Sequence, residues 1–174
     1  DDSLQTLAIT GAGASAIVAT FSGAAGTVVA TATGGDGAET LSVTPGASGL
    51  MSVSTGAGND RVNITSIAAT HTIDGGAGTD TLSTTVAITT TTGANISNFE
   101  TVRIAGGVTV ALPSTNTVAT LTIADAGGGT LTNLAAGGTV NLTTGGAATV
   151  TNTTGWTGSA DAITVNVGAA SSTG

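Results

Sequence analysis

Short runs in which apolar and polar residues alternate recur along the whole chain. In residues 84–92 and 118–123, Val, Ile or Leu lies at alternate positions among Thr and Ala. Because residues two apart in a strand face the same side, this pattern predicts short strands with one face turned inward. Glycine is spread through the whole chain, which argues against long helices, where each Gly costs about 0.8–1.0 kcal/mol relative to Ala. Further strands are expected within residues 4–9, 70–73 and 96–104, and residues 158–165 are interpreted as a degenerate repeat.

The composition narrows the class of fold. The chain has 174 residues, of which 28 are Gly. Gly, Thr and Ala together make up more than half of the chain. Only 7% of the residues are charged, against about 25% in an ordinary globular domain. Disordered chains combine low hydrophobicity with high charge, so this composition does not indicate disorder. Collagen is excluded, because Gly does not occupy every third position. Many short strands joined by Gly turns indicate an all-β fold, a β-solenoid, sandwich or barrel.

Charge and hydropathy limit the partners. Ten acidic residues face two basic ones, Arg61 and Arg103, for a formal net charge of −8. Nucleic acid is excluded as a partner, since its affinity for proteins comes mainly from Lys and Arg on phosphates. The mean hydropathy is +0.41, yet no run approaches the ~20 apolar residues of a spanning helix, so the chain is not expected to span a membrane. Hard metal cations suit such an acidic surface.

Three stretches of the sequence, residues 34–42, 55–63 and 75–83, align without gaps. Each reads GGxGxDxUx, where U is aliphatic, and this nonapeptide is the calcium-binding repeat of RTX proteins. The first copy has Glu39 in place of Asp, and the second has Thr55 in place of the first Gly. If one coil holds two nonapeptides, or about 18 residues, a small insertion brings the same side of consecutive coils into register.

The residue types of the nonapeptide suit calcium. Gly permits left-handed backbone angles and lets carbonyl oxygens converge, and the acid supplies a negative ligand. The aliphatic residue, Leu41, Val62 or Leu82, is expected to point inward along a short strand. Calcium takes six to eight oxygens at about 2.3–2.6 Å, which two stacked turns can supply and one cannot.

We expect one calcium ion between the Asp36/Glu39 and Asp60 turns, and a second between the Asp60 and Asp80 turns. The alternative is that these are only Gly-rich hairpin turns, which favour Asp and Asn for their geometry. Asp74 is either a turn residue or a further ligand. The residues expected to form the calcium sites are Gly35, Asp36, Gly37, Glu39, Gly56, Gly58, Asp60, Gly76, Gly78 and Asp80.

The nonapeptides, followed by Ile96–Ile104 with its Phe99-Glu100 pair, resemble the GGxGxDxL and IxxFExVxV arrangement of bacterial RTX-type surface-layer proteins. The resemblance implies an RTX-like parallel β-roll with Gly-rich calcium turns. It further implies a secreted protein that lies on the bacterial cell surface and assembles with copies of itself. Ile96, Phe99, Val102 and Ile104 are expected to face inward and Glu100 and Arg103 outward, with Glu100 as a metal ligand or lattice contact the alternative.

No composition shift divides the chain, so one continuous domain over residues 1–174 is expected, with a calcium block at 34–83. The chain opens on Asp1 rather than Met and reads as a segment of a longer protein. Trp156 is interpreted as a packing anchor, with recognition of a sugar such as a cell-surface polysaccharide as the alternative.

An enzyme is not expected, because the chain has no Lys, Cys or Tyr, one His and no GxSxG motif. His71 alone is not expected to bind zinc. The favoured function is therefore structural, a calcium-stabilised surface-layer segment. The alternatives are an RTX adhesin or stalk, a non-catalytic module of a secreted enzyme, and an ice-binding solenoid, which is disfavoured because the Thr positions outside the repeats drift.

Overall fold

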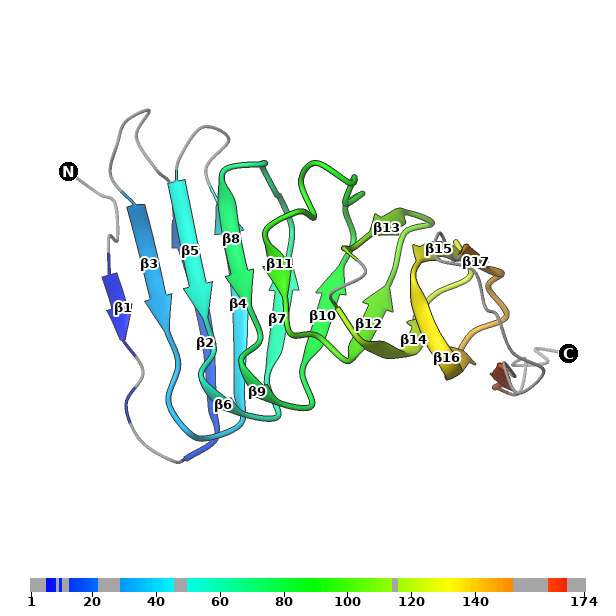
Figure 1. The fold of residues 1–174 in the computed structure, drawn as a ribbon, viewed down its shortest axis with the longest axis horizontal. Coiled ribbons are helices and arrows are strands. Elements are labelled where there is room, and N and C mark those ends of the chain that lie inside the picture. Colours follow the sequence, from blue (N-terminus) through cyan, green and yellow to red (C-terminus); the bar gives the residue numbers. More distant parts are fainter. Residues whose placement is uncertain are drawn as a thin grey trace, which may run out of the picture.

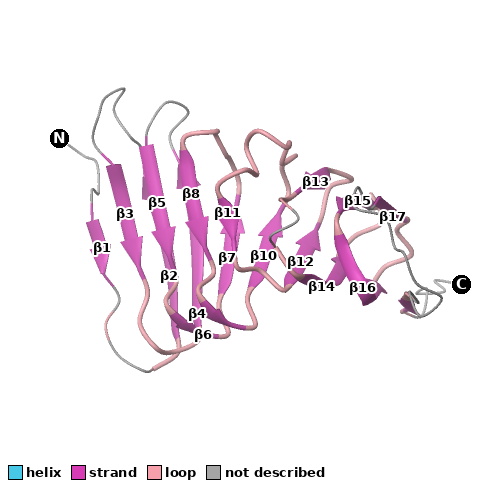
Figure 2. Cartoon of the chain, viewed as in Figure 1, coloured by secondary structure: helices cyan, strands magenta, loops and turns pink. Residues whose placement is uncertain are grey.

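The chain winds into a β-solenoid whose parallel strands stack coil upon coil (Figure 1). The structure is a computed structural model that describes residues 6–8, 10, 13–21, 29–45, 50–113, 116–151 and 163–168. Every strand pair within these ranges is parallel, and none of their residues is helical (Figure 2). The prediction of an all-β solenoid is confirmed.

One eight-stranded sheet runs along the solenoid, and neighbouring strands in it come from successive coils. Its order is β18-β16-β14-β12-β10-β7-β4-β2. The strands are β2 (Ser15–Phe21), β4 (Glu39–Pro45), β7 (Arg61–Ile64), β10 (Thr81–Thr84), β12 (Thr101–Ile104), β14 (Val118–Ile123), β16 (Leu134–Leu142) and β18 (Thr164–Val167).

Three smaller sheets complete the coils. A five-stranded sheet contains β1 (Thr6–Ala8), β3 (Val29–Thr33), β5 (Leu50–Ser54), β8 (His71–Asp74) and β11 (Ile96–Ser97). A three-stranded sheet contains β13 (Thr109–Ala111), β15 (Gly129–Thr132) and β17 (Ala148–Thr151). The short strands β6 (Ala57–Gly58) and β9 (Ala77–Gly78) pair with each other.

The register of the eight-stranded sheet places the three nonapeptides directly above one another. Leu41 lies beside Val62, and Val62 beside Leu82. These three side chains are 2%, 0% and 0% exposed, so the prediction that they point inward is confirmed. A coil in this region is therefore 20 or 21 residues long, as the separations of equivalent residues show. It carries one Gly turn rather than two nonapeptides, because its other corners are built from unrelated residues.

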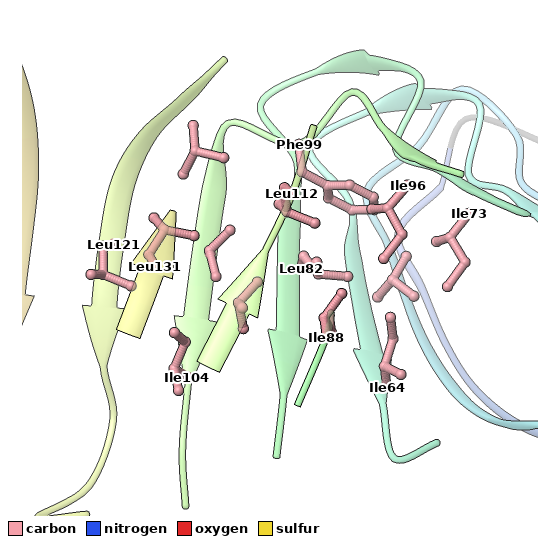
Figure 3. Packing of buried hydrophobic residues seen from close by; sticks show 14 of the residues in the cluster. Ile64, Ile73, Leu82, Ile88, Ile96, Phe99, Ile104, Leu112, Leu121 and Leu131 are labelled. Carbon is pink, nitrogen blue, oxygen red and sulfur yellow. The ribbon is translucent and has the colours of Figure 1, made fainter. Parts of the chain in front are cut away.

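A narrow apolar core fills the space between the sheets (Figure 3). Inward residues of the eight-stranded sheet form two columns that continue through Val102 and Ile104. Ile96, Phe99, Val102 and Ile104 are all at most 1% exposed, which confirms that they face inward. Phe99 is among the largest of the fully buried side chains that the structure describes.

The strand expected over residues 84–92 is wrong beyond its first residue. β10 ends at Thr84, and residues 85–95 form bends and turns with only an isolated bridge from Ile88 to Val110. The hydroxyls of Thr89 and Thr92 hydrogen-bond to each other. Each hydroxyl also accepts the backbone amide of the other residue, which closes the turn. Thr therefore stabilises a turn here by local hydrogen bonds that compete with the strand ladder.

No helix that is long and apolar enough to cross a bilayer occurs in the part of the chain that the structure describes. Trp156 and the start of the 158–165 segment lie outside the described residues, so the expectations for them stay predictions. The last two residues of that segment, Thr164 and Val165, begin β18, which continues to Val167.

Candidate cation site

The glycine turns stack along one edge of the solenoid. The Ala57 amide donates to the Gly35 carbonyl, and the Ala77 amide donates to the Gly56 carbonyl, each at 2.9 Å. Gly56, Gly58, Gly76 and Gly78 have positive φ angles, and a Cβ on Gly58 would collide with the Gly37 carbonyl below it. The same holds for Gly78 above Gly58. Glycine is therefore required so that the backbones of successive turns can approach closely.

Four acids, one from each of four successive coils, form a carboxylate column beside these turns: Glu39, Asp60, Asp80 and Glu100. One carboxylate oxygen of each later member accepts the backbone amide of the member before it. The Glu39 amide donates to Asp60 Oδ1 and the Asp60 amide to Asp80 Oδ1, both at 2.7 Å. The Asp80 amide donates to Glu100 Oε2 at 2.8 Å. The column thus connects four coils through charge-assisted hydrogen bonds.

Three members of the column are buried with an oxygen unused. Glu39, Asp60 and Asp80 are 1%, 1% and 0% exposed. Glu39 Oε1, Asp60 Oδ2 and Asp80 Oδ2 have no hydrogen-bond partner. A buried carboxylate without a compensating partner is strongly unfavourable, so its oxygens call for either a proton or a cation.

The pKa values of the column reflect this environment. Burial, reinforced by repulsion from Asp60, raises the pKa of Glu39, although the Gly35 amide works against the shift. Burial likewise raises the pKa of Asp80 to about 6. The hydrogen bond from the Asp60 amide lowers that pKa, while repulsion from Asp60, Glu100 and Asp74 raises it further. In the chain alone, protonation therefore reduces the cost of burying these carboxylates and the repulsion between them.

The raised pKa of Asp80 predicts that, in the absence of cations, the folded chain is more stable at acidic pH than at neutral pH. Because the pKa of Asp80 is about 6 in the folded chain and 3.8 in the unfolded chain, protonation favours folding. The stabilisation is fully present below about pH 4 and is lost as the pH rises through about 6. In calcium-free buffer, thermal unfolding followed by circular dichroism should give a higher melting temperature at pH 4.5 than at pH 7.5. Asp80→Asn should flatten this dependence, and a higher melting temperature at pH 7.5 would contradict the prediction.

The column fits a hard cation held jointly by side chains and backbone. Among the described residues, no three carboxylate or imidazole groups converge closely enough to hold a metal ion by themselves. Calcium accepts carbonyl oxygens as readily as carboxylates, and the stacked turns bring both to the same edge. The residues that would hold it are the buried acids of the column, with the carbonyls of the Gly turns.

The other residues expected at the site are placed differently. Asp36 lies exposed in the first turn, whereas Glu39 takes the buried place in the column. Asp74 Oδ1 accepts the Gly76 amide, the Ser97 hydroxyl and the Asn98 side-chain amide, so turn geometry already accounts for it. Gly35 contributes its amide to Glu39 Oε2 at 3.3 Å.

Glu100 was expected to point outward with Arg103, and this expectation is wrong in part. Glu100 is half-buried and its carboxylate accepts the Asp80 amide, as the fourth member of the column. The signal for its place was the spacing: Glu100 follows Asp80 by 20 residues, as Asp80 follows Asp60. The absence of a GGxG turn before Glu100 hid this equivalence.

The outer face of the eight-stranded sheet corrects a further expectation. Four threonines outside the repeats do not drift, because the sheet aligns Thr101, Thr120, Thr139 and Thr164 in one column with Thr81 of the third repeat. Coils of unequal length conceal this register in the linear sequence. The neighbouring column is chemically mixed, since it contains Asn63, Ser83 and Arg103. The in-register Thr array on this face is therefore limited to one column.

His71 has a structural place in β8. It is 1% exposed, and its Nδ1 accepts the Ala68 amide at 3.1 Å, which holds the tight connection that precedes the strand.

Comparisons of the chain with protein-family models, with curated proteins and with solved structures found no match.

Proposed function

We propose that this chain is a structural segment of an extracellular bacterial surface layer, stiffened by calcium and built to associate with copies of itself. The observation that supports it best is the carboxylate column, with three buried acids that each have an unpartnered oxygen beside stacked Gly turns. Calcium would supply the missing positive charge and link successive coils. The surface-layer role itself rests on the resemblance of the repeats.

The ends of the eight-stranded sheet support self-association. Among the strands that the structure describes, β2 and β18 are the outer strands of this sheet, and each has one edge without a neighbour from those strands. In β18, Val165 and Val167 continue the two inner apolar columns, yet they are 57% and 69% exposed. An exposed strand edge with apolar residues favours pairing with another strand. Head-to-tail contacts of this kind generate open filaments when the rotation between copies does not close into a ring.

Calcium is therefore expected to enlarge the assemblies that this chain forms. It would order the coils and reduce the net charge of −8 that keeps copies apart. Sodium chloride screens the same repulsion without occupying the column. Light scattering should show larger particles in 10 mM calcium chloride than in sodium chloride of matched ionic strength.

The double substitution Val165→Thr and Val167→Thr is a matched control, because it keeps β-branched side chains and removes only the apolar contact. We expect it to reduce the calcium-induced assemblies while the circular dichroism spectrum is retained.

Electron microscopy separates the two main roles: two-dimensional sheets support a surface layer, and isolated rods favour an adhesin or stalk. Equal particle sizes in calcium and sodium would contradict calcium-dependent assembly.

A further inference from the structure

The carboxylate column extends one coil beyond the nonapeptides, and the same amide-to-carboxylate hydrogen bond recurs in each of its intervals. The hydrogen bond from the Asp80 amide to Glu100 is 2.8 Å long, and those from the Glu39 and Asp60 amides to their acids are 2.7 Å. The backbone repeats in the same way, since Thr81 pairs with Arg61 on one side and with Thr101 on the other. The amide-to-carboxylate hydrogen bond and the strand register between Asp80 and Glu100 thus match those between Asp60 and Asp80.

The group at the centre of this arrangement is Asp80. Its side chain is 0% exposed, and its Oδ2 has no partner, although Asp80 lies between two other acids of the column. An acid of the column on each side and a buried oxygen without a partner form an environment in which a bound cation is stabilising.

A backbone ligand is also open at this level. The Gly35 and Gly56 carbonyls each accept an alanine amide from the turn above. The coil that contains Glu100 has no glycine turn, and no backbone amide of the described chain donates to the Gly76 carbonyl. Gly76 is half-buried and lies in the third glycine turn, in the same coil as Asp80, so its carbonyl is the backbone ligand that we consider at this level.

We propose that Glu100 is a cation ligand and that a calcium position lies between the carboxylates of Asp80 and Glu100, outside the three nonapeptides. The proposal rests on the proposed function, because it assumes that the column binds calcium. It adds a site that the motif does not define, with Glu100 in the place that Asp takes in the repeats.

Glutamate labelling tests this directly in the unmodified chain. Glu39 and Glu100 are the only two Glu residues, so a chain labelled with ¹³C at the glutamate side-chain carboxyl gives two assignable carboxyl signals. Titration with calcium chloride, at ionic strength held constant with sodium chloride, should shift the Glu100 signal. A Glu100 signal that stays in place while the Glu39 signal moves would overturn this inference and leave the proposed function standing. If neither signal moves, the proposed function fails as well.

Equilibrium dialysis against calcium supplies the count. E100Q keeps an oxygen that can accept the Asp80 amide but loses the charge, and it should bind one calcium ion fewer than the unmodified chain. D125N is the matched control: it removes one charge from an acid outside the column, whose carboxylate accepts the Gly106 and Gly127 amides. It should bind as many ions as the unmodified chain. An undiminished count in E100Q overturns the proposal, and if E100Q does not fold, the carboxyl signals of the unmodified chain decide.

Discussion

Removal of calcium is expected to lower the melting temperature of this chain by about 6–20 °C. Extracellular calcium modules have dissociation constants of about 10⁻⁴–10⁻³ M, so 10 mM calcium contributes about 1.4–2.7 kcal/mol for each site. Two sites contribute about 3–5 kcal/mol, and each kcal/mol moves the melting temperature of a chain of this size by about 2–4 °C. Thermal unfolding in chelator and in 10 mM calcium chloride measures the difference at pH 7.5.

The effect should be local as well as large. Without a cation, the buried acids of the column repel one another, so amide hydrogen exchange should accelerate most within residues 34–83. The coils around β14 and β16, which contain no member of the column, should change less. Identical melting temperatures in chelator and calcium would contradict calcium stabilisation.

Asp60→Asn is the informative variant for this prediction, since it removes the central charge and retains an oxygen for the Glu39 amide. In chelator it should raise the melting temperature, because a buried carboxylate with an unpartnered oxygen is replaced by a neutral amide. In calcium it should lower the melting temperature, because a ligand is lost. Asp125→Asn, outside the column, should have the same small effect in both solutions.

Phe99→Ala is expected to lower the free energy of unfolding by about 3–5 kcal/mol, the usual cost of removing a large buried aromatic side chain. Phe99 is 0% exposed, and its side chain points into the apolar core near Ile96 (Figure 3). The loss is serious here because the core is narrow and contains few side chains of this volume. Denaturant unfolding in saturating calcium measures it without a contribution from empty cation sites.

Phe99→Leu is the matched control, because it keeps most of the apolar volume and should cost less than half as much. The backbone at this position is held separately: Asn116 Oδ1 accepts the Phe99 amide at 3.3 Å, and Asn116 Nδ2 donates to the Ile96 carbonyl at 2.7 Å. A loss below about 1 kcal/mol for Phe99→Ala would mean that the core closes over the gap.

The sequence predicts the local features of this protein well. The alternation in residues 118–123 corresponds to β14, and the inward positions of Leu41, Val62 and Leu82 follow from strand periodicity. The spacing of the nonapeptides is sufficient to predict that their turns stack. These features depend on neighbouring residues and on a repeat of nearly constant length, and both are visible in the linear chain.

The tertiary structure alone decides which distant residues share a column. Glu100 joins the acids, and Thr139 and Thr164 align, because the backbone register sets their neighbours while the corners absorb coils of different length. The end of β10 at Thr84 was hidden for a related reason, since Thr serves a strand and a turn equally well until a partner strand is present. The unpartnered oxygens of the buried acids appear only when stacking excludes water from them. Burial and register arise only when the coils pack against one another, so they cannot be derived from the sequence of a single coil.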